Sequence, residues 1–136
     1  DRAKATWTNG RTGMIGKSWD GTIANGVAAT GVKGLKTIVP ISAISSWYDY
    51  YFAKGAPLYD SGPDWLSGYV DSPEATAKCA AVQQKLVDGA PRTGDWTKFW
   101  SERDYVKDAS KVRASVFLVH GMQDLNVRTK NFGQWW

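Results

Sequence analysis

Cysteine is almost absent from this chain. Cys79 is the only one in 136 residues, so no disulfide can form within the chain. No apolar run is long enough to cross a membrane, and we expect no membrane partner. Internal repeats, low-complexity tracts and linkers are missing as well, which predicts one domain or part of one.

A concentrated positive charge is also missing. Lys and Arg number 17 against 13 Asp and Glu, which gives a net charge of +4, and the basic residues are scattered among acids. A nucleic-acid surface would more often gather its basic residues into a stripe. We therefore expect no nucleic-acid partner.

The most informative stretch is GMIGKSWDGT at residues 13–22. A short apolar run leads to a serine among small residues, and a segment with helical spacing follows. This layout is typical of a nucleophile elbow, in which a strand turns sharply into a helix and presents the serine. Such a turn needs small residues on both sides of Ser18. Gly16 meets that need, but Asp20 stands where glycine is expected and Gly21 follows one residue late. An ordinary Gly/Ser turn is the alternative interpretation.

A second stretch, near the other end of the chain, supports the elbow. Residues 116–119, VFLV, predict a strand buried on both faces, as in parallel sheets. Asp124 follows on a loop at the carboxyl end of this strand, where the active sites of open α/β sheets lie. A serine on an elbow and a later aspartate beyond a buried strand match the Ser, Asp, His order of α/β-hydrolases.

Three motifs stand in order along the chain: GKSWDGT at 16–22, WYDYY at 47–51 and VHGMQDLNV at 119–127. Together they resemble the Xaa-Pro dipeptidyl-peptidase family of α/β-hydrolase serine peptidases, most closely its actinobacterial members. The serine motif of that family is Gly-x-Ser-Tyr-x-Gly, which explains the offset glycine. Trp19 replaces the tyrosine.

The resemblance implies roles for individual residues. Ser18 would be the nucleophile, Asp124 the acid of the triad, and the backbone N–H of Trp19 one oxyanion donor. The implied substrate is a peptide with proline at the second position, and no cofactor and no metal are implied. Resemblance to the actinobacterial members also favours secretion.

The base of the triad is not evident. His120 is the only histidine and precedes Asp124 by four residues at a strand end, so we interpret it as structural; a substitute base is the alternative. In the family the base follows the acid. We therefore expect a longer parent chain to supply it, and these 136 residues to be inactive or nearly so alone. A complete α/β-hydrolase usually needs well over about 200 residues, which agrees.

Residues 47–52, WYDYYF, hold five aromatics in six positions. Packing within a lid is one explanation. The other is an aromatic wall that holds the proline ring, which offers apolar faces and no backbone N–H. The candidates for substrate binding are Trp19, Trp47 and Tyr48.

The predicted fold class is α/β: a partial α/β-hydrolase fold with parallel strands, a nucleophile elbow and a helical lid insertion. Residues 1–46 would form the core with the elbow. Residues 47–110 would form the lid or cap, and residues 111–136 the core strand with the acid loop.

Local signals predict several elements within this frame. A helix should run from Ser18 to about Thr30 and stop at Gly31, and a strand should occupy residues 35–41. A later helix, capped by Ser72, should run to about Val87 and stop at Gly89. Another should start near Asp95 and carry four residues on one face: Trp96, Phe99, Trp100 and Arg103. Residues 1–7 should form the end of a helix.

The predicted function is a serine peptidase that releases N-terminal Xaa-Pro dipeptides through an acyl-enzyme. An esterase or acylase of the same superfamily is the nearest alternative, because the same triad cleaves esters and amides. A non-catalytic binding module built on the eight tryptophans is a weaker alternative, because no repeat lines them up.

Overall fold

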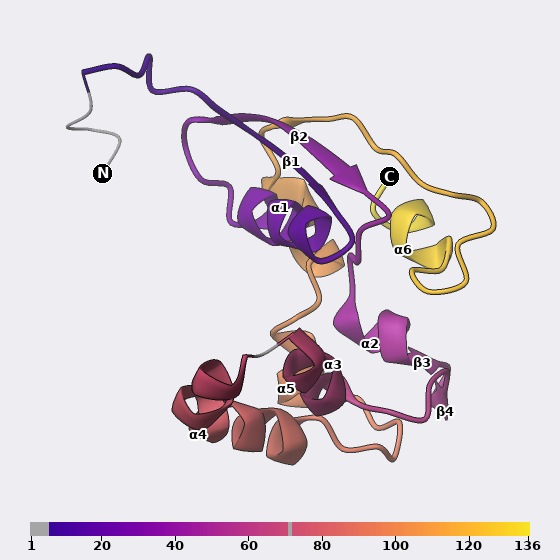
Figure 1. Ribbon diagram of the computed structural model, residues 1–136. Helices are drawn as coiled ribbons and strands as arrows, with labels where there is room; N and C mark the ends of the chain where they lie inside the picture. The colour runs from indigo at the N-terminus through magenta and orange to yellow at the C-terminus, as the bar shows by residue number, and fades with distance from the viewer. Residues whose placement is uncertain (1–5, 71) are drawn as a thin grey trace. The chain divides into compact units, whose positions relative to one another are not determined.

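The computed structural model describes residues 6–70 and 72–136 (Figure 1). The helix end expected at residues 1–7 falls mainly on residues 1–5, which lie outside the described part. Within the described residues, no helix combines the length and the apolar character needed to cross a membrane.

The chain divides into two compact units. The first unit joins the segment that ends at Ser46 to the segment Asp104–Trp136, and the second unit is Trp47–Arg103. The lid role expected for residues 47–110 stays a prediction.

A parallel sheet forms the centre of the first unit, with the strand order β1-β2-β5 (Figure 1). Its strands are β1 (Thr12–Lys17), β2 (Leu35–Ile41) and β5 (Ser115–Val116). Lys17 pairs with Ile41, and Ile41 forms an isolated parallel bridge with Val119. The carboxyl ends of the three strand segments therefore meet at one edge of the sheet.

One helix covers one face of this sheet. Helix α1 (Trp19–Ala29) has Thr30 as its C-cap, and Gly31 follows with a φ of 68°, close to the end that the sequence predicts. The helix and sheet bury apolar side chains against each other, and Met14 and Val116 pack at the margin. The buried core consists of Ala24, Ala28, Leu35 and Ile38.

The prediction that residues 116–119 are buried on both faces is wrong. Side chains alternate along this segment, and Phe117 is 67% exposed. Ile15 of β1 is 73% exposed on the same side. The reason is that α1 covers one face only, while apolar strand residues point to both.

Two short helical segments complete the first unit. The 3₁₀ segment Val106–Lys111 precedes β5, and α6 (Lys130–Gly133) follows the loop after β5. Within the 3₁₀ segment, the Lys111 ammonium lies 2.7 Å from a carboxylate oxygen of Asp108. This hydrogen bond lowers the pKa of the Asp108 carboxyl below its ordinary value.

The second unit consists of helices and one small hairpin, and aromatic side chains gather around Trp100. Trp100 is 1% exposed and contacts the rings of Tyr48, Tyr51 and Phe52 at centroid distances of 5.9, 5.9 and 5.7 Å. The elements are α2 (Trp47–Tyr51), β3 (Phe52–Ala53), β4 (Ala56–Pro57), α3 (Pro63–Val70), α4 (Pro73–Gly89) and α5 (Lys98–Ser101).

Helix α4 forms where its capping signal predicts it. The Ser72 hydroxyl accepts a hydrogen bond from the amide of Ala75 (3.2 Å), and the helix ends at Gly89 as expected. The Glu74 carboxylate accepts a hydrogen bond from its own backbone amide and a weaker one from the Ser72 side chain. Both bonds lower the pKa of the Glu74 carboxyl.

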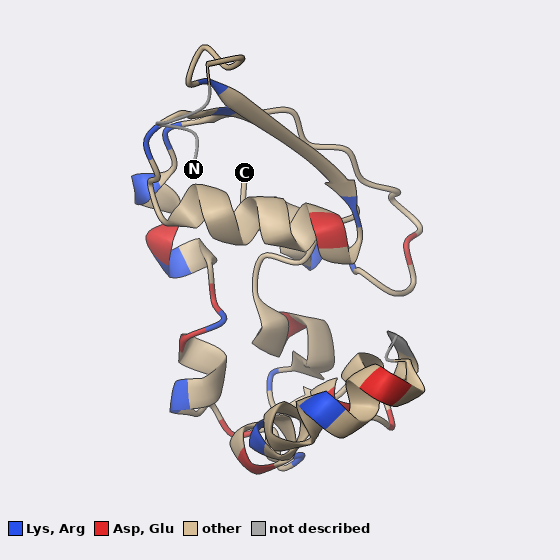
Figure 2. Ribbon diagram, turned by 60° about the vertical axis from the view of Figure 1, so that its left-hand side comes forward, with Lys and Arg blue, Asp and Glu red and all other residues tan. Residues whose placement is uncertain are grey.

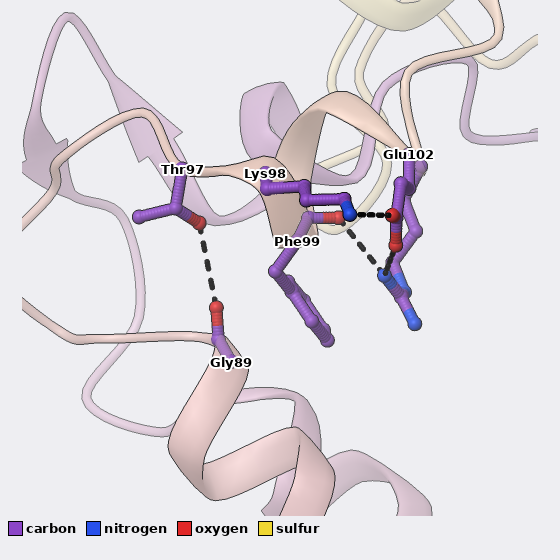
Figure 3. A network of polar contacts seen from close by, with 6 residues as sticks. Gly89, Thr97, Lys98, Phe99 and Glu102 are labelled. Atoms are coloured by element: carbon purple, nitrogen blue, oxygen red, sulfur yellow. Dashed lines mark hydrogen bonds and ion pairs between the residues drawn. The ribbon is translucent and has the colours of Figure 1, made fainter.

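Helix α5 is shorter than the sequence predicts. It begins at Lys98, after Thr97, so Trp96 lies outside the helix. Figure 3 shows the Thr97 hydroxyl directed at the carbonyl of Gly89, where the two oxygens lie 3.4 Å apart. This contact with the end of α4 and the extended backbone of Thr97 place the start of α5 about three residues late.

Charged residues at the end of α5 and just after it pair with one another on the surface. Glu102, the C-cap, lies 3.7 Å from Lys98 (Figure 3). Glu102 also lies 3.7 Å from Arg103, whose guanidinium stacks 3.8 Å above the Phe99 ring. Figure 2 shows Lys and Arg on both units, interleaved with Asp and Glu.

Candidate active site

Ser18 occupies the sharp turn between β1 and α1. Its φ of 55° and ψ of −114° are unusual for a residue with a side chain. A Cβ on Gly16 would lie 2.5 Å from the Cβ of Asp20, and one on Gly21 would lie 2.7 Å from the carbonyl oxygen of Gly16. Both glycines are therefore required by close approach across the turn, as the elbow interpretation predicts.

Hydrogen bonds hold the strained backbone of Ser18 in place. Its amide donates to the carbonyl of Ile41 (2.8 Å), and its carbonyl accepts from the amide (2.9 Å) and the hydroxyl (2.8 Å) of Thr22. The same hydroxyl accepts from the amide of Ile44 (2.9 Å). Thr22 is buried and thus joins the elbow to the loop after β2.

Helix α1 begins directly after Ser18. The Ser18 hydroxyl makes no capping bond to the helix, so it is not occupied as an N-cap. Trp19 is the first residue of α1, and its side chain is 38% exposed. The helix start carries partial positive charge, which suits an oxyanion beside Ser18. The oxyanion role of the Trp19 N–H stays a prediction.

Asp124 lies in residues 120–128, which we call the acid loop. Its Oδ1 accepts hydrogen bonds from the amides of Asn126 (3.0 Å) and Val127 (2.9 Å). Both bonds end on the same oxygen, so the loop orients the carboxylate, and within the described residues Oδ2 keeps its lone pairs for another donor. A fixed carboxylate of this kind suits the task of orienting a base.

The far end of the acid loop is anchored by Asn131 of α6. Its buried Oδ1 accepts from the amide of Ser45 (3.1 Å), and its carbonyl accepts from the Ser45 hydroxyl (2.6 Å). Gln134 donates to the same hydroxyl (3.0 Å). Sequence reasoning missed this anchor, because its partners are 86 residues apart and no local pattern links them.

His120 begins the acid loop. Its Nε2 lies 2.8 Å from the carbonyl oxygen of Val127, and its ring packs at 5.0 Å from that of Phe132. Nδ1 is buried and finds no partner among the described residues. With one nitrogen bound and the other buried, the ring is placed as a structural group, and its use as a base for Ser18 is not supported.

Ser18 and Asp124 follow strand segments that end at the same sheet edge. Ser18 comes directly after β1, and Asp124 lies on the loop after Val119, with β2 between them (Figure 1). The carboxyl edge of a parallel sheet is where substrate sites of α/β folds lie. The two candidate triad residues thus belong to one edge of one unit.

The other two aromatic candidates belong to the second unit. The Tyr48 hydroxyl donates to the carbonyl of Gly94, and its ring contacts Trp96 at 5.0 Å. The Trp47 ring stacks on Tyr51 at 6.4 Å. These contacts agree with the packing explanation for this segment, and substrate binding by Trp47 and Tyr48 stays a prediction.

Comparison with known proteins identifies the family. The sequence profile of the X-Pro dipeptidyl-peptidase (S15 family) matches residues 2–136. The chain belongs to this S15 family. A Xaa-Pro dipeptidyl-peptidase homologue of Streptomyces avermitilis is 92% identical over 99% of the chain, and the Xaa-Pro dipeptidyl-peptidase of Lactiplantibacillus plantarum is 42% identical over 98%.

The S15 chain is much shorter than these relatives. It spans 20% of the Streptomyces protein and 18% of the Lactiplantibacillus protein. Among solved structures, the acylaminoacyl peptidase of Pyrococcus horikoshii superposes over 98% of the chain and 18% of its own length, with a TM-score of 0.63 and 16% identity. The likeness, together with the parallel sheet and elbow, shows a partial α/β-hydrolase fold.

Proposed function

We propose that the longest native chain containing these residues, called here the native polypeptide, is a serine peptidase that releases N-terminal Xaa-Pro dipeptides. The observation that carries the proposal is the strained turn at Ser18, with two glycines that admit no side chain. Membership of the S15 family supports a peptide substrate, and the description of that family favours proline at the second position.

In the proposed reaction, Ser18 Oγ attacks the carbonyl carbon that follows proline. A histidine elsewhere in the native polypeptide takes the hydroxyl proton, and Asp124 Oδ2 accepts the N–H of that histidine. The carbonyl oxygen becomes an oxyanion beside the N–H of Trp19, a contact that contributes about 3 to 4 kcal/mol in comparable sites.

The intermediate then collapses in two stages. The C–N bond breaks, the leaving amine takes the proton from the histidine, and the Xaa-Pro acyl group stays on Ser18 as an ester. Water attacks this ester with the same histidine as base, which releases the dipeptide and restores the hydroxyl. The aromatic face of Trp19, which directly follows Ser18 in the first unit, would hold the proline ring by shape.

The test compares three substrates on the native polypeptide: Ala-Pro-p-nitroanilide, Ala-Ala-p-nitroanilide and p-nitrophenyl butyrate. We expect strong preference for the proline anilide, and its loss in Ser18→Ala. Ester hydrolysis without anilide cleavage would favour the esterase alternative. Full anilide activity in Ser18→Ala would refute the assignment of the nucleophile.

A second prediction concerns the acid. In Asp124→Asn the side-chain oxygen can still accept from the amides of Asn126 and Val127, so the loop should keep its conformation. The new NH₂ group would then face the base with donors and favour the wrong tautomer. We expect kcat to fall by about 10⁴-fold with little change in thermal stability.

The matched control for this variant is Asp60→Asn, which removes the same charge from an exposed position in the second unit. Its kcat should stay at the wild-type value. If Asp124→Asn behaved like the control, Asp124 would not be the acid.

A further inference from the structure

We propose that His120 is a positioning residue for the acid of the triad, and this inference rests on the proposed function. Its Nε2 is bound to the carbonyl oxygen of Val127, seven residues along the chain (2.8 Å). That bond closes the acid loop around Asp124.

Val127 links the imidazole to the carboxylate. Its carbonyl oxygen binds His120, while its amide donates to Asp124 Oδ1 (2.9 Å). Val127 is itself 2% exposed, so this residue is fixed by packing as well as by hydrogen bonds. Two consecutive hydrogen bonds, from His120 to Val127 and from Val127 to Asp124, therefore connect the end of the strand segment to the carboxylate and fix its orientation.

The protonation of the ring follows from its partner. A carbonyl oxygen only accepts, so Nε2 carries the proton and donates it to Val127. In the neutral ring, Nδ1 is left as a buried acceptor without a partner among the described residues. An apolar side chain would pack against Phe132 without burying such an atom. The feature that distinguishes histidine from an apolar residue at this position is therefore the Nε2–H donor.

Two substitutions separate the donor from the packing. His120→Leu keeps an apolar side chain beside Phe132 and removes the donor. His120→Gln places an amide NH₂ near the position of Nε2, and an open hollow of about 320 Å³ beside His120 leaves room for it. Measured in the native polypeptide with Ala-Pro-p-nitroanilide, we expect His120→Leu to lower kcat about tenfold or more at nearly constant KM. His120→Gln should stay within about threefold of wild type.

The same substitution in the Asp124→Asn background tests whether His120 acts through the acid. We expect His120→Leu to lower kcat no further there, because the group that it positions is already lost. An equal fall in both backgrounds, an unchanged kcat in His120→Leu, or a fall in His120→Gln as large as in His120→Leu would each overturn the proposal.

Amide hydrogen exchange supplies a readout that does not depend on activity. The amides of Asn126 and Val127 donate to Asp124, so they should exchange faster in His120→Leu and at the wild-type rate in His120→Gln. Unchanged exchange in both variants would refute the positioning role of the hydrogen bond from His120 to Val127, even if Ser18 and Asp124 prove catalytic. Conversely, active Ser18→Ala would refute the function and leave the exchange result standing.

Discussion

At the scale of single residues, the elbow depends on the absence of side chains. A Cβ on Gly21 would lie 2.7 Å from the carbonyl oxygen of Gly16 and 3.2 Å from the amide nitrogen of Ile41. Both atoms belong to the backbone, so neither can rotate away. We expect Gly21→Ala to destabilise the native polypeptide by about 1 to 3 kcal/mol and to lower kcat by displacing Ser18.

Gly68 provides the matched control for this substitution. It lies in α3, and a Cβ there would meet nothing within 4 Å. Gly68→Ala should therefore raise the free energy of unfolding by about 0.5 to 1 kcal/mol and leave kcat unchanged. Urea unfolding and initial rates measure both variants. Equal effects of the two substitutions would contradict the close approach in the turn.

The residues that the sequence predicts well are those that act on near neighbours. Ser18, Gly16 and Gly21 lie within one turn, so their spacing reflects the geometry directly. Asn131 depends on Ser45, which is 86 residues away, and no local pattern can indicate such a bond. The hydrogen bond between His120 and Val127 is an intermediate case, because the sequence predicts a structural imidazole but does not identify Val127 as its partner.

At the scale of elements, local capping signals predict helices better than apolar spacing does. The Ser72 cap and terminal glycine give the observed limits of α4, although this helix buries none of its described residues. The aromatic spacing from Trp96 to Arg103 predicts one helix, yet α5 spans only Lys98–Ser101. Tertiary packing of aromatic rings determines where this helix begins, because Trp96 packs on Tyr48 from a position before the helix.

Helix α2 contains a buried hydroxyl with a consequence at high pH. Tyr51 is 5% exposed, and its hydroxyl has no hydrogen-bond partner among the described residues. Burial is the main cause that raises the pKa of Tyr51 well above its ordinary value, and the nearby Tyr50, Asp64 and Tyr59 raise it further. The folded state therefore keeps the proton of Tyr51 after the unfolded chain has lost it.

The sign of the pH effect follows. Below about pH 10 both states hold the proton, and Tyr51 contributes no pH dependence. Above that pH the unfolded state binds fewer protons, so the free energy of unfolding should fall by at most about 1.4 kcal/mol per pH unit from this group. Urea unfolding from pH 8 to 11 should show a shallower fall in Tyr51→Phe than in wild type. The exposed Tyr69→Phe is the control, and identical slopes in Tyr51→Phe and wild type would contradict the prediction.

At the scale of the whole molecule, the order of elements indicates the fold class, but their burial does not follow from it. A strand, a helix and a strand with buried apolar runs predict a parallel sheet, and the structure has one. The consecutive apolar residues 116–119 predict that both faces are covered, whereas the described residues place α1 on one face only. Burial depends on the surroundings of the sheet, which the pattern within each strand cannot specify.

The exposed face carries a continuous apolar row. Ile15 pairs with Val39, and the register of β2 with β5 places Phe117 on the other side of Val39. A row of this kind beside strand edges favours association between copies of the chain. We expect the 136-residue chain, produced by itself, to self-associate, and Phe117→Lys to lower its average mass in sedimentation velocity at equal concentration. Val82→Lys, which adds the same charge on the exposed surface of α4, should leave the mass unchanged. An equal fall in both variants would assign the effect to net charge, and the apolar row would then have no part in association.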